Sequence, residues 1–278
     1  MNTFLENLDS SCQSNESLVC LGLDPELDRI PTKDVVTFNK AIVEATCDLV
    51  GAYKPNLAFY EALGLTGFKA LEETIKFIRE VSDTTIVIGD GKRGDIGHTA
   101  SVYAKGMFDN WGFDAITVNA YGGEDSVLPF LNYSDKGVFV WCRSSNAGAS
   151  DFQDLKIKSQ SSGETPFYKQ VACEIQRWNK NGNAGLVMGA TYPDQIRETR
   201  GICPDMPFLI PGIGSQDGAL EHSVRNGVSS AGRRILINSS RGLIYADETQ
   251  NFAKGAREAT RQLRDNINRI LESLGLRW

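Results

Sequence analysis

The sequence predicts an α/β protein built as a single (β/α)8, or TIM, barrel. Eight short apolar runs rich in β-branched residues are spaced along the chain, flanked by Gly, Asp, Pro or Asn. Between them lie segments with apolar residues at three- and four-residue spacing, as in amphipathic helices. Strands that alternate with helices form right-handed parallel units. Eight such units close into a barrel whose active site lies at the carboxyl ends of the strands.

The expected elements are distributed over the whole chain, and we expect residues 1–278 to form one barrel domain. The apolar runs are residues 18–23, 52–60, 85–89, 115–120, 138–142, 185–189, 207–213 and 234–238. The clearest helical patterns are residues 35–50, 68–81, 100–111, 167–179 and 252–274. Residues 146–166 are rich in Ser, Gly, Asp and Gln, so we expect a long irregular loop there. It would be either a lid over the catalytic face or a solvated surface loop.

The composition limits the kinds of binding partner and the cellular compartment that we expect for this protein. The net charge is −6 and the 29 Lys and Arg residues are scattered, so we expect a small molecule or a protein as partner and no nucleic acid. No apolar stretch suits a membrane span, and residues 1–16 lack the pattern of a signal peptide. The six cysteines are far apart and form no Cys-x-x-Cys pair, which indicates reduced thiols. We therefore expect a soluble, cytoplasmic protein.

No metal site is expected. The only two histidines, His98 and His222, are too few and too far apart in the sequence to indicate a metal site, and they show no ligand spacing. We expect both to lie on the surface or to make local hydrogen bonds.

Charged and amide side chains stand at the ends of the first three expected strands: Asp24, Lys54, Asn56, Asp90, Lys92 and Asp95. On the outside of a helix such residues would form a solvated face. At the carboxyl ends of barrel strands they converge on one cavity, where charges are costly unless they are paired. The alternation of lysine and aspartate would allow a pocket to hold several charges.

Residues 89–96 carry the most specific pattern, Gly-Asp-Gly-Lys-Arg-Gly-Asp-Ile. Asp90 and Asp95 flank Lys92, and three glycines would allow the backbone to bend closely around a ligand. The carboxylates would keep Lys92 protonated and oriented and would repel a carboxylate on the substrate, so its ammonium is a candidate general acid. Taken alone, the same residues also suit a surface turn with ion pairs.

The turns after the seventh and eighth strands suggest a phosphate site. Residues 211–216 read Pro-Gly-Ile-Gly-Ser-Gln and residues 238–242 read Asn-Ser-Ser-Arg-Gly. Backbone N–H groups at these places bind phosphate in barrels, and Arg241 would add a bidentate guanidinium. Gly-rich turns are common, so the prediction depends on both turns together. Residues 142–146, Cys-Arg-Ser-Ser-Asn, would suit the amide edge of a pyrimidine or an ordinary turn.

At residues 90–96 the sequence resembles the orotidine 5′-phosphate decarboxylase family, which carries Asp-x-Lys-x-x-Asp-Ile after the third barrel strand. Further matching segments fall in the family's order and at its strand ends, namely residues 21–25, 54–59, 144–146, 211–216 and 238–242. The resemblance spans about residues 18–246 and is strongest to the branch with longer loops. Ser240 stands where many relatives have glycine, a change that leaves a backbone N–H contact intact.

The resemblance implies decarboxylation of orotidine 5′-phosphate to UMP and CO2, the last step of de novo pyrimidine synthesis, without a cofactor. Lys92 would protonate C6 as CO2 leaves, while Asp90 would hold Lys92 and crowd the departing carboxylate. Lys54 would complete the charge network and bond the ribose. The remaining implied contacts are Asp24 and Asn56 to the ribose, Ser145 to the pyrimidine, and Pro211, Gln216, Arg241 and Gly242 to the phosphate.

The chemistry fits these residue types. Loss of CO2 leaves a carbanion at C6, and without a cofactor as electron sink the site itself must stabilise it. A fixed ammonium beside that carbon does so electrostatically and then donates a proton. Members of the family are dimers with composite sites, which implies that the catalytic Asp95, together with Ile96 and Thr99, reaches into the neighbouring subunit's pocket.

Two other functions are compatible with the same barrel. One is a Mg2+-dependent sugar-phosphate lyase or decarboxylase that shares the Asp-x-Lys-x-x-Asp motif. Those relatives have a carboxylate on the second strand as a metal ligand, whereas Lys54 supplies a cation there. The other is a barrel that only binds nucleotides or acts as a scaffold, and the presence of every expected charged residue argues against it.

Overall fold

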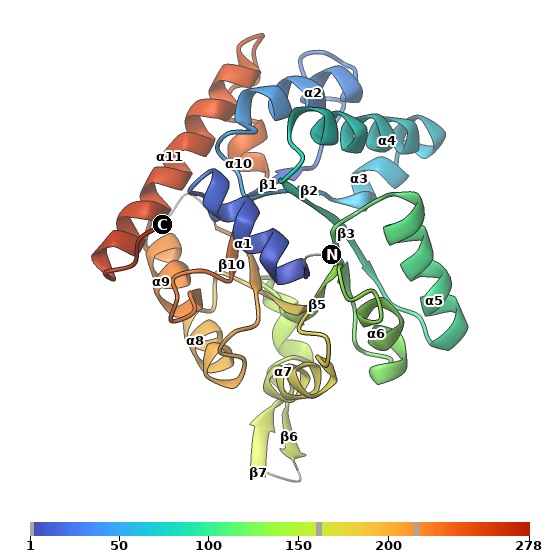
Figure 1. The fold of residues 1–278 in the computed structure, drawn as a ribbon, viewed down its shortest axis with the longest axis vertical. Coiled ribbons are helices and arrows are strands. Elements are labelled where there is room, and N and C mark those ends of the chain that lie inside the picture. The colour runs from blue at the N-terminus through green and yellow to red at the C-terminus, as the bar shows by residue number, and fades with distance from the viewer. Residues whose placement is uncertain (1–2, 160–162, 214–216) are drawn as a thin grey trace.

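Eight parallel strands form a closed barrel in the computed structural model, which describes residues 3–159, 163–213 and 217–278 (Figure 1). The strands are β1 (Val19–Leu23), β2 (Ala52–Pro55), β3 (Ile86–Arg93), β4 (Ala115–Val118), β5 (Gly137–Arg143), β8 (Ala184–Met188), β9 (Phe208–Pro211) and β10 (Ile235–Ser239). Around the barrel they follow the order β1-β10-β9-β8-β5-β4-β3-β2. Each apolar run contains or overlaps one strand, which confirms the predicted (β/α)8 barrel.

The second apolar run is a strand only in its first part. β2 ends at Pro55, and the short helix α3 (Leu57–Glu61) follows. Asn56 has an extended backbone, and its side chain accepts a hydrogen bond from the N–H of Ala58 at 3.2 Å. The prediction of a strand up to residue 60 was wrong, because this N-terminal cap starts a helix within the apolar run.

Helices connect the strands and surround the barrel (Figure 1). The five predicted patterns correspond to α2 (Val35–Thr46), α4 (Gly64–Val81), α5 (Gly97–Lys105), α7 (Phe167–Trp178) and α11 (Phe252–Ser273). The predicted helix at residues 100–111 is not continuous, because α5 ends at Lys105 and Gly106–Asn110 form a π-helical turn. Besides α3, the described helices outside these five patterns are α1 (Phe4–Ser14), α6 (Glu124–Leu131), α8 (Pro193–Ile202), α9 (Asp217–Gly227) and α10 (Arg241–Ile244).

Helix α1 covers the end of the barrel where the strands begin, and in Figure 1 it lies across the ring of strands. The ring of Phe4 packs edge-on against Phe139 of β5, with centroids 6.1 Å apart. A Cβ atom at Gly137 would overlap the Phe4 ring, so glycine is required there. Ser11 Oγ donates to the carbonyl of Gly51, just before β2, at 2.7 Å. With this end covered, the carboxyl ends of the strands form the open mouth.

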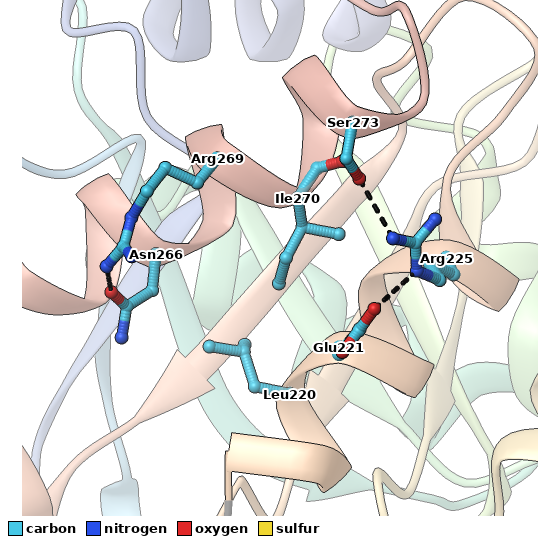
Figure 2. A pocket seen from close by; sticks show the side chains of 7 residues that line it. All are labelled: Leu220, Glu221, Arg225, Asn266, Arg269, Ile270 and Ser273. Atoms are coloured by element: carbon cyan, nitrogen blue, oxygen red, sulfur yellow. Dashed lines mark hydrogen bonds and ion pairs between the residues drawn. The ribbon is translucent and has the colours of Figure 1, made fainter.

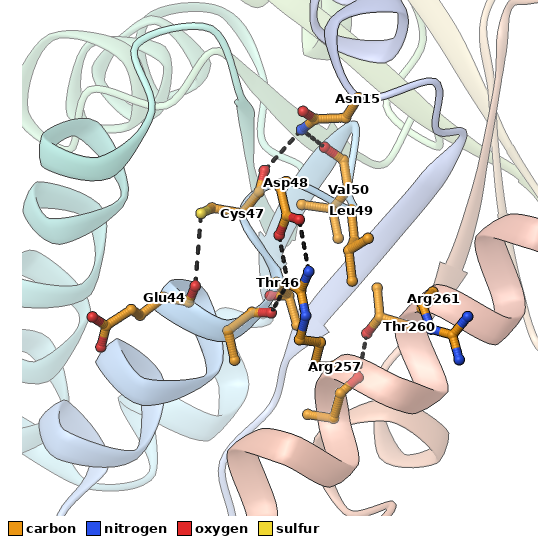
Figure 3. A network of polar contacts seen from close by, with 12 residues as sticks. Asn15, Glu44, Thr46, Cys47, Asp48, Leu49, Val50, Arg257, Thr260 and Arg261 are labelled. Carbon is orange, nitrogen blue, oxygen red and sulfur yellow. Dashed lines mark hydrogen bonds and ion pairs between the residues drawn. The ribbon is translucent and has the colours of Figure 1, made fainter.

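A polar network binds α11 to the connection between α2 and β2 (Figure 3). Arg257 donates to both carboxylate oxygens of Asp48, at 2.6 and 2.8 Å. Asn15, just after α1, donates to the carbonyls of Cys47 and Val50 at 2.8 and 2.9 Å. The network therefore joins three segments that are far apart in the sequence.

Residues 146–166 are more regular than predicted. Ala147–Asp151 form a 3-10 helix, and β6 (Lys156–Ser159) and β7 (Gly163–Pro166) pair as an antiparallel two-stranded sheet. Figure 1 shows this hairpin projecting away from the barrel. The expected irregular loop was wrong, because an antiparallel hairpin exposed to water does not need the apolar pattern by which strands are recognised. The role of this segment as a lid stays a prediction.

All six cysteines are free thiols in the described part of the chain, and Cys12, Cys20, Cys142 and Cys203 are buried. His98 and His222 are exposed, as predicted. None of the described helices combines the length and the apolar character that a membrane crossing requires.

Candidate active site

The carboxyl ends of the strands enclose a cavity of about 270 Å3. Its polar lining consists of Asp24, Lys54, Asn56, Asp90, Lys92, Thr117, Ser144, Ser145 and Asn238. Its other walls are Trp141, Val187, Leu209 and Pro211. A concave, partly apolar site with convergent polar groups at this end of a barrel is the expected place for a ligand.

Within this cavity, Asp90 binds two lysines. Lys54 Nζ donates to Asp90 Oδ2 at 2.8 Å, and Lys92 Nζ donates to Asp90 Oδ1 at 2.7 Å. The side chains of Lys54 and Asp90 are 4% and 8% exposed, whereas that of Lys92 is 36% exposed. Lys54 and Asp90 thus form the buried part of the array, and the ammonium of Lys92 is the part open to a ligand.

The buried charges stabilise one another. Burial by itself lowers the pKa of Lys54, but the charges of Asp90 and Asp24 outweigh it and hold this pKa above the ordinary 10.5. Burial raises the pKa of Asp90, but the two lysines outweigh it and hold this pKa below the ordinary 3.8. Lys54 and Asp90 are therefore both charged at neutral pH.

The backbone of β3 leaves the regular ladder at this motif. Gly89 pairs with Ile116 and Arg93 pairs with Val118, so the register between β3 and β4 shifts in between. Lys92 lies in the irregular stretch and has a φ of +43°. Residues with a side chain rarely adopt this left-handed conformation, and such strain concentrates at functional sites.

Two glycines of the motif face the protein rather than a ligand. A Cβ atom at Gly89 would lie 2.7 Å from the ring of Phe113, and one at Gly91 would lie 2.8 Å from Leu57 Cδ1. These glycines make room for core side chains, and the bending of their backbone around a ligand stays a prediction. The residue that carries the unusual conformation is Lys92 itself.

The structure brings together seven of the predicted site residues at one cavity: Asp24, Lys54, Asn56, Asp90, Lys92, Ser145 and Pro211. Arg241 and Gly242 are exposed at the start of α10, directly after β10, and do not line it. Asp95, Ile96 and Thr99 are exposed near the start of α5 and do not line the cavity of their own chain either. Gln216 lies outside the described residues.

Sequence reasoning missed Thr117, and it named Asn238 only as the first residue of the turn expected at the phosphate. Both are buried at strand ends, as the predicted residues are, but Thr117 gave no signal because it is an uncharged side chain in an apolar run. The carbonyl oxygen of the Asn238 side chain and Oδ1 of Asp24 have no hydrogen-bond partner among the described residues. Buried polar atoms are normally satisfied, so both suit a polar ligand in the cavity.

Arg143 anchors the segment after β5. Its guanidinium is fully buried, donates to both carboxylate oxygens of Asp154 at 3.0 and 2.9 Å, and stacks on the ring of Tyr192 at 3.8 Å. Gln153, beside Asp154, accepts a hydrogen bond from the backbone N–H of Ser144 at 2.8 Å. These contacts hold the cavity-lining serines relative to the segment 146–166.

A second hollow of about 370 Å3 lies outside the barrel, between α9 and α11 (Figure 2). Arg225 crosses it, donating to Glu221 at 2.8 Å and to Ser273 at 2.9 Å. This hollow is larger than the mouth cavity but contains none of the strand-end residues. Arg225 is paired with Glu221, and Arg269 donates to the side-chain carbonyl of Asn266. The mouth cavity is therefore the candidate active site.

A family model described as "Orotidine 5'-phosphate decarboxylase / HUMPS family" matches residues 17–256. The chain belongs to this family. The orotidine 5′-phosphate decarboxylase of Thermomicrobium roseum is 47% identical over 275 residues, covering 96% of this chain and 96% of that protein. That of Roseiflexus castenholzii is 45% identical, covering 98% and 99%. The solved structure of Leishmania donovani OMP decarboxylase has a TM-score of 0.83 at 37% identity and covers 97% and 98% of the two chains.

Family membership confirms the resemblance read from the motifs, and the structure shows what surrounds Ser240, where the sequence departs from many relatives. A Cβ atom at Gly22 of β1 would lie 2.6 Å from Ser240 Cβ. Glycine at position 22 thus provides the space that the serine occupies. Gly22 lies on β1 and Ser240 directly follows β10, and these two strands pair.

Proposed function

We propose that this protein converts orotidine 5′-phosphate to UMP and CO2, with Lys92 as the proton donor. The observation that carries the proposal is the Lys92 ammonium, held by a buried carboxylate and open to the mouth cavity. Family membership and the names of the relatives support the reaction.

In the proposed reaction the bond between C6 and the carboxylate breaks, CO2 leaves, and the electron pair stays on C6. The ammonium of Lys92 stabilises this charge and transfers a proton to C6, and water then reprotonates the amine. Asp90 holds the ammonium in place and stands close to the departing carboxylate. Lys54 neutralises Asp90 from the buried side, so the carboxylate stays ionised throughout.

The remaining residues would bind the substrate. Asp24, Asn56 and Lys54 would bind the ribose, a role supported by the buried Oδ1 of Asp24, which has no partner within the described part of the chain. Ser145 would bind the pyrimidine. The phosphate would lie beyond Pro211, where Gln216, Arg241 and the N–H of Gly242 follow β9 and β10. Binding energy from the phosphate would then help to position the reacting carbon.

We also propose a homodimer in which Asp95, Ile96 and Thr99 complete the partner's site. The three residues are exposed in the single chain, and so are Val102 and Tyr103 of α5 and Tyr121 after β4. Exposed apolar groups gathered in one region are typical of subunit interfaces. A cytoplasmic location, supported by the free thiols, and a function as one barrel domain are part of the same proposal.

The Mg2+-dependent reaction is not favoured. Its relatives place a carboxylate where this chain has Lys54, whose ammonium is buried against Asp90. A cation at that place repels a metal ion. Among the described residues, no three His, Cys, Asp or Glu side chains gather closely enough to hold one.

The test follows the absorbance change of orotidine 5′-phosphate in excess EDTA, with wild type and Lys92→Ala. Wild type should turn over, and the variant should lose about 10³-fold or more in kcat, as expected for loss of a general acid that also stabilises charge. Turnover by wild type only after addition of Mg2+ would favour the sugar-phosphate chemistry instead. Binding of UMP without turnover would favour a barrel that only binds nucleotides.

The composite site is tested by mixing two inactive variants, Lys92→Ala and Asp95→Ala. A mixed dimer contains one site with both substitutions and one intact site, so random exchange should restore about a quarter of the wild-type sites. No recovery, despite subunit exchange shown by a size-tagged partner, would contradict the shared site.

A further inference from the structure

Thr117 is the residue of β4 that lies opposite the irregular stretch of β3. Ile116 pairs with Gly89 and Val118 pairs with Arg93, which leaves Thr117 alone across from residues 90–92. The residue is 1% exposed, and it lines the active-site cavity. The side chain of Thr117 is therefore placed to hydrogen-bond the polar groups of β3 that the bulge removes from the strand ladder.

The hydroxyl of Thr117 makes two hydrogen bonds of opposite sense. It accepts from the backbone N–H of Lys92 at 2.9 Å and donates to Asp90 Oδ1 at 2.8 Å. A hydroxyl has a single proton to donate, and a backbone N–H can only donate. The direction of both bonds is thus fixed, and the proton of Thr117 points at the carboxylate.

These contacts close a ring. It runs from the N–H of Lys92 through the Thr117 hydroxyl to Asp90 Oδ1, and from there to Lys92 Nζ at 2.7 Å. The ring contains the left-handed backbone of Lys92, which needs support from its surroundings to persist. Both ends of Lys92, backbone and ammonium, are therefore fixed relative to one carboxylate oxygen.

We propose that Thr117 is a positioning residue for proton transfer. Its hydroxyl holds the left-handed turn at Lys92 and orients Asp90 Oδ1, and so sets the place of the Lys92 ammonium against the carbon that it protonates. The inference rests on the proposed role of Lys92 in orotidine 5′-phosphate decarboxylation. It extends that role to a side chain that touches the acid and its carboxylate.

A purely structural hydroxyl would behave differently from a positioning one. Loss of a structural hydrogen bond lowers stability and affects binding and turnover alike. Loss of a positioning contact lowers kcat while the affinity for the product changes little, because the misplaced group acts in the transition state. The loss in kcat relative to the loss in product affinity therefore distinguishes a positioning hydroxyl from a purely structural one.

The experiment compares Thr117→Val, Thr117→Ala and Thr117→Ser with wild type. Valine keeps the branched shape without the hydroxyl, and the Ser and Ala variants differ from each other only in the hydroxyl. Thr260→Val is the matched control, because Thr260 is fully buried on α11 and its hydroxyl donates to the carbonyl of Ala256 in the same helix, at 2.7 Å (Figure 3). Each variant is assayed for kcat, KM, UMP affinity by calorimetry and thermal unfolding.

We expect Thr117→Val and Thr117→Ala to lose about 10- to 100-fold in kcat, as for a hydrogen bond to a charged group, with UMP affinity within about twofold. Thr117→Ser should keep most of the activity, and Thr260→Val should match wild type in kcat. If Val fails to fold, the Ser and Ala pair decides alone. Equal kcat for Ser and Ala, or a loss in UMP affinity as large as the loss in kcat, would overturn the proposal. Failure of wild type to turn over would instead overturn the proposed function.

Discussion

Ion pairs at the two ends of the barrel have very different surroundings. At the mouth, the side chains of Lys54 and Asp90 are 4% and 8% exposed and meet at 2.8 Å. Beyond the opposite end, those of Arg257 and Asp48 are 45% and 56% exposed and meet at the shorter distance of 2.6 Å. Water can replace a lost partner only in the second pair. Burial, rather than distance, therefore decides what each pair contributes.

The pair of Arg143 and Asp154 lies between these extremes. Its guanidinium is fully buried, while the carboxylate is 37% exposed. One substitution, aspartate to asparagine, keeps the shape and removes the charge in all three pairs. A series of three variants thus tests whether the loss in free energy of unfolding increases with the burial of the ion pair.

The largest effect is expected for Asp90→Asn. The variant leaves the ammonium of Lys54 buried without its counter-charge, so the free energy of unfolding should fall by about 3–5 kcal/mol. Urea denaturation at pH 7 measures it. kcat should also fall by about 10²-fold or more, since Lys92 loses the carboxylate that orients it. A stability equal to that of wild type would mean that water reaches Lys54.

The pH dependence of unfolding sharpens the same contrast. Because the pKa of Asp90 in the folded protein lies below the ordinary 3.8, the carboxylate contributes stability that is fully present above that value. The contribution is lost as the pH falls further through the folded pKa. The pKa of Lys54 is raised above 10.5, so its contribution is present below that pH and is lost as the pH rises through the folded pKa.

Denaturation of wild type and Asp90→Asn at several pH values checks this behaviour. The difference in stability between the two proteins should stay constant from about pH 5 to 9 and shrink below about pH 4, where the unfolded carboxyl takes up a proton. A difference that instead grows on acidification would show that the pKa of Asp90 is raised.

An intermediate effect is expected for Asp154→Asn. Arg143 keeps its other acceptors and its stacking on Tyr192, so the free energy of unfolding should fall by about 1–3 kcal/mol. KM for orotidine 5′-phosphate should rise a few-fold, because Gln153 next to it holds Ser144 at the cavity. A KM equal to that of wild type, together with lowered stability, would show that the pair of Arg143 and Asp154 has only a structural role.

The smallest effect is expected for Asp48→Asn, which is also the control for the other two variants. The partner, Arg257, is exposed, so water can solvate its guanidinium when Asp48 loses its charge. The free energy of unfolding should therefore fall by less than about 1 kcal/mol, and the loss should shrink further in high salt. kcat should equal that of wild type. A loss as large as that of Asp90→Asn would refute the dependence on burial.

The sequence alone determined the barrel and most of the charged site. Eight apolar runs predicted the eight strands, because the side chains that fill a barrel must be apolar wherever they lie in the chain. Lys54, Asp90 and Lys92 were found because charges at the ends of such runs are unusual. The substrate class followed from the resemblance at residues 90–96, which family membership confirms.

Only the tertiary structure decided which groups meet. Thr117 donates to Asp90 although the two are 27 residues apart, and it looked like any β-branched residue of an apolar run. The left-handed turn falls on Lys92 rather than on one of the neighbouring glycines, and Gly22 of β1 leaves room for Ser240, which directly follows β10. These are contacts between strands, and the register that creates them depends on the closure of the whole barrel.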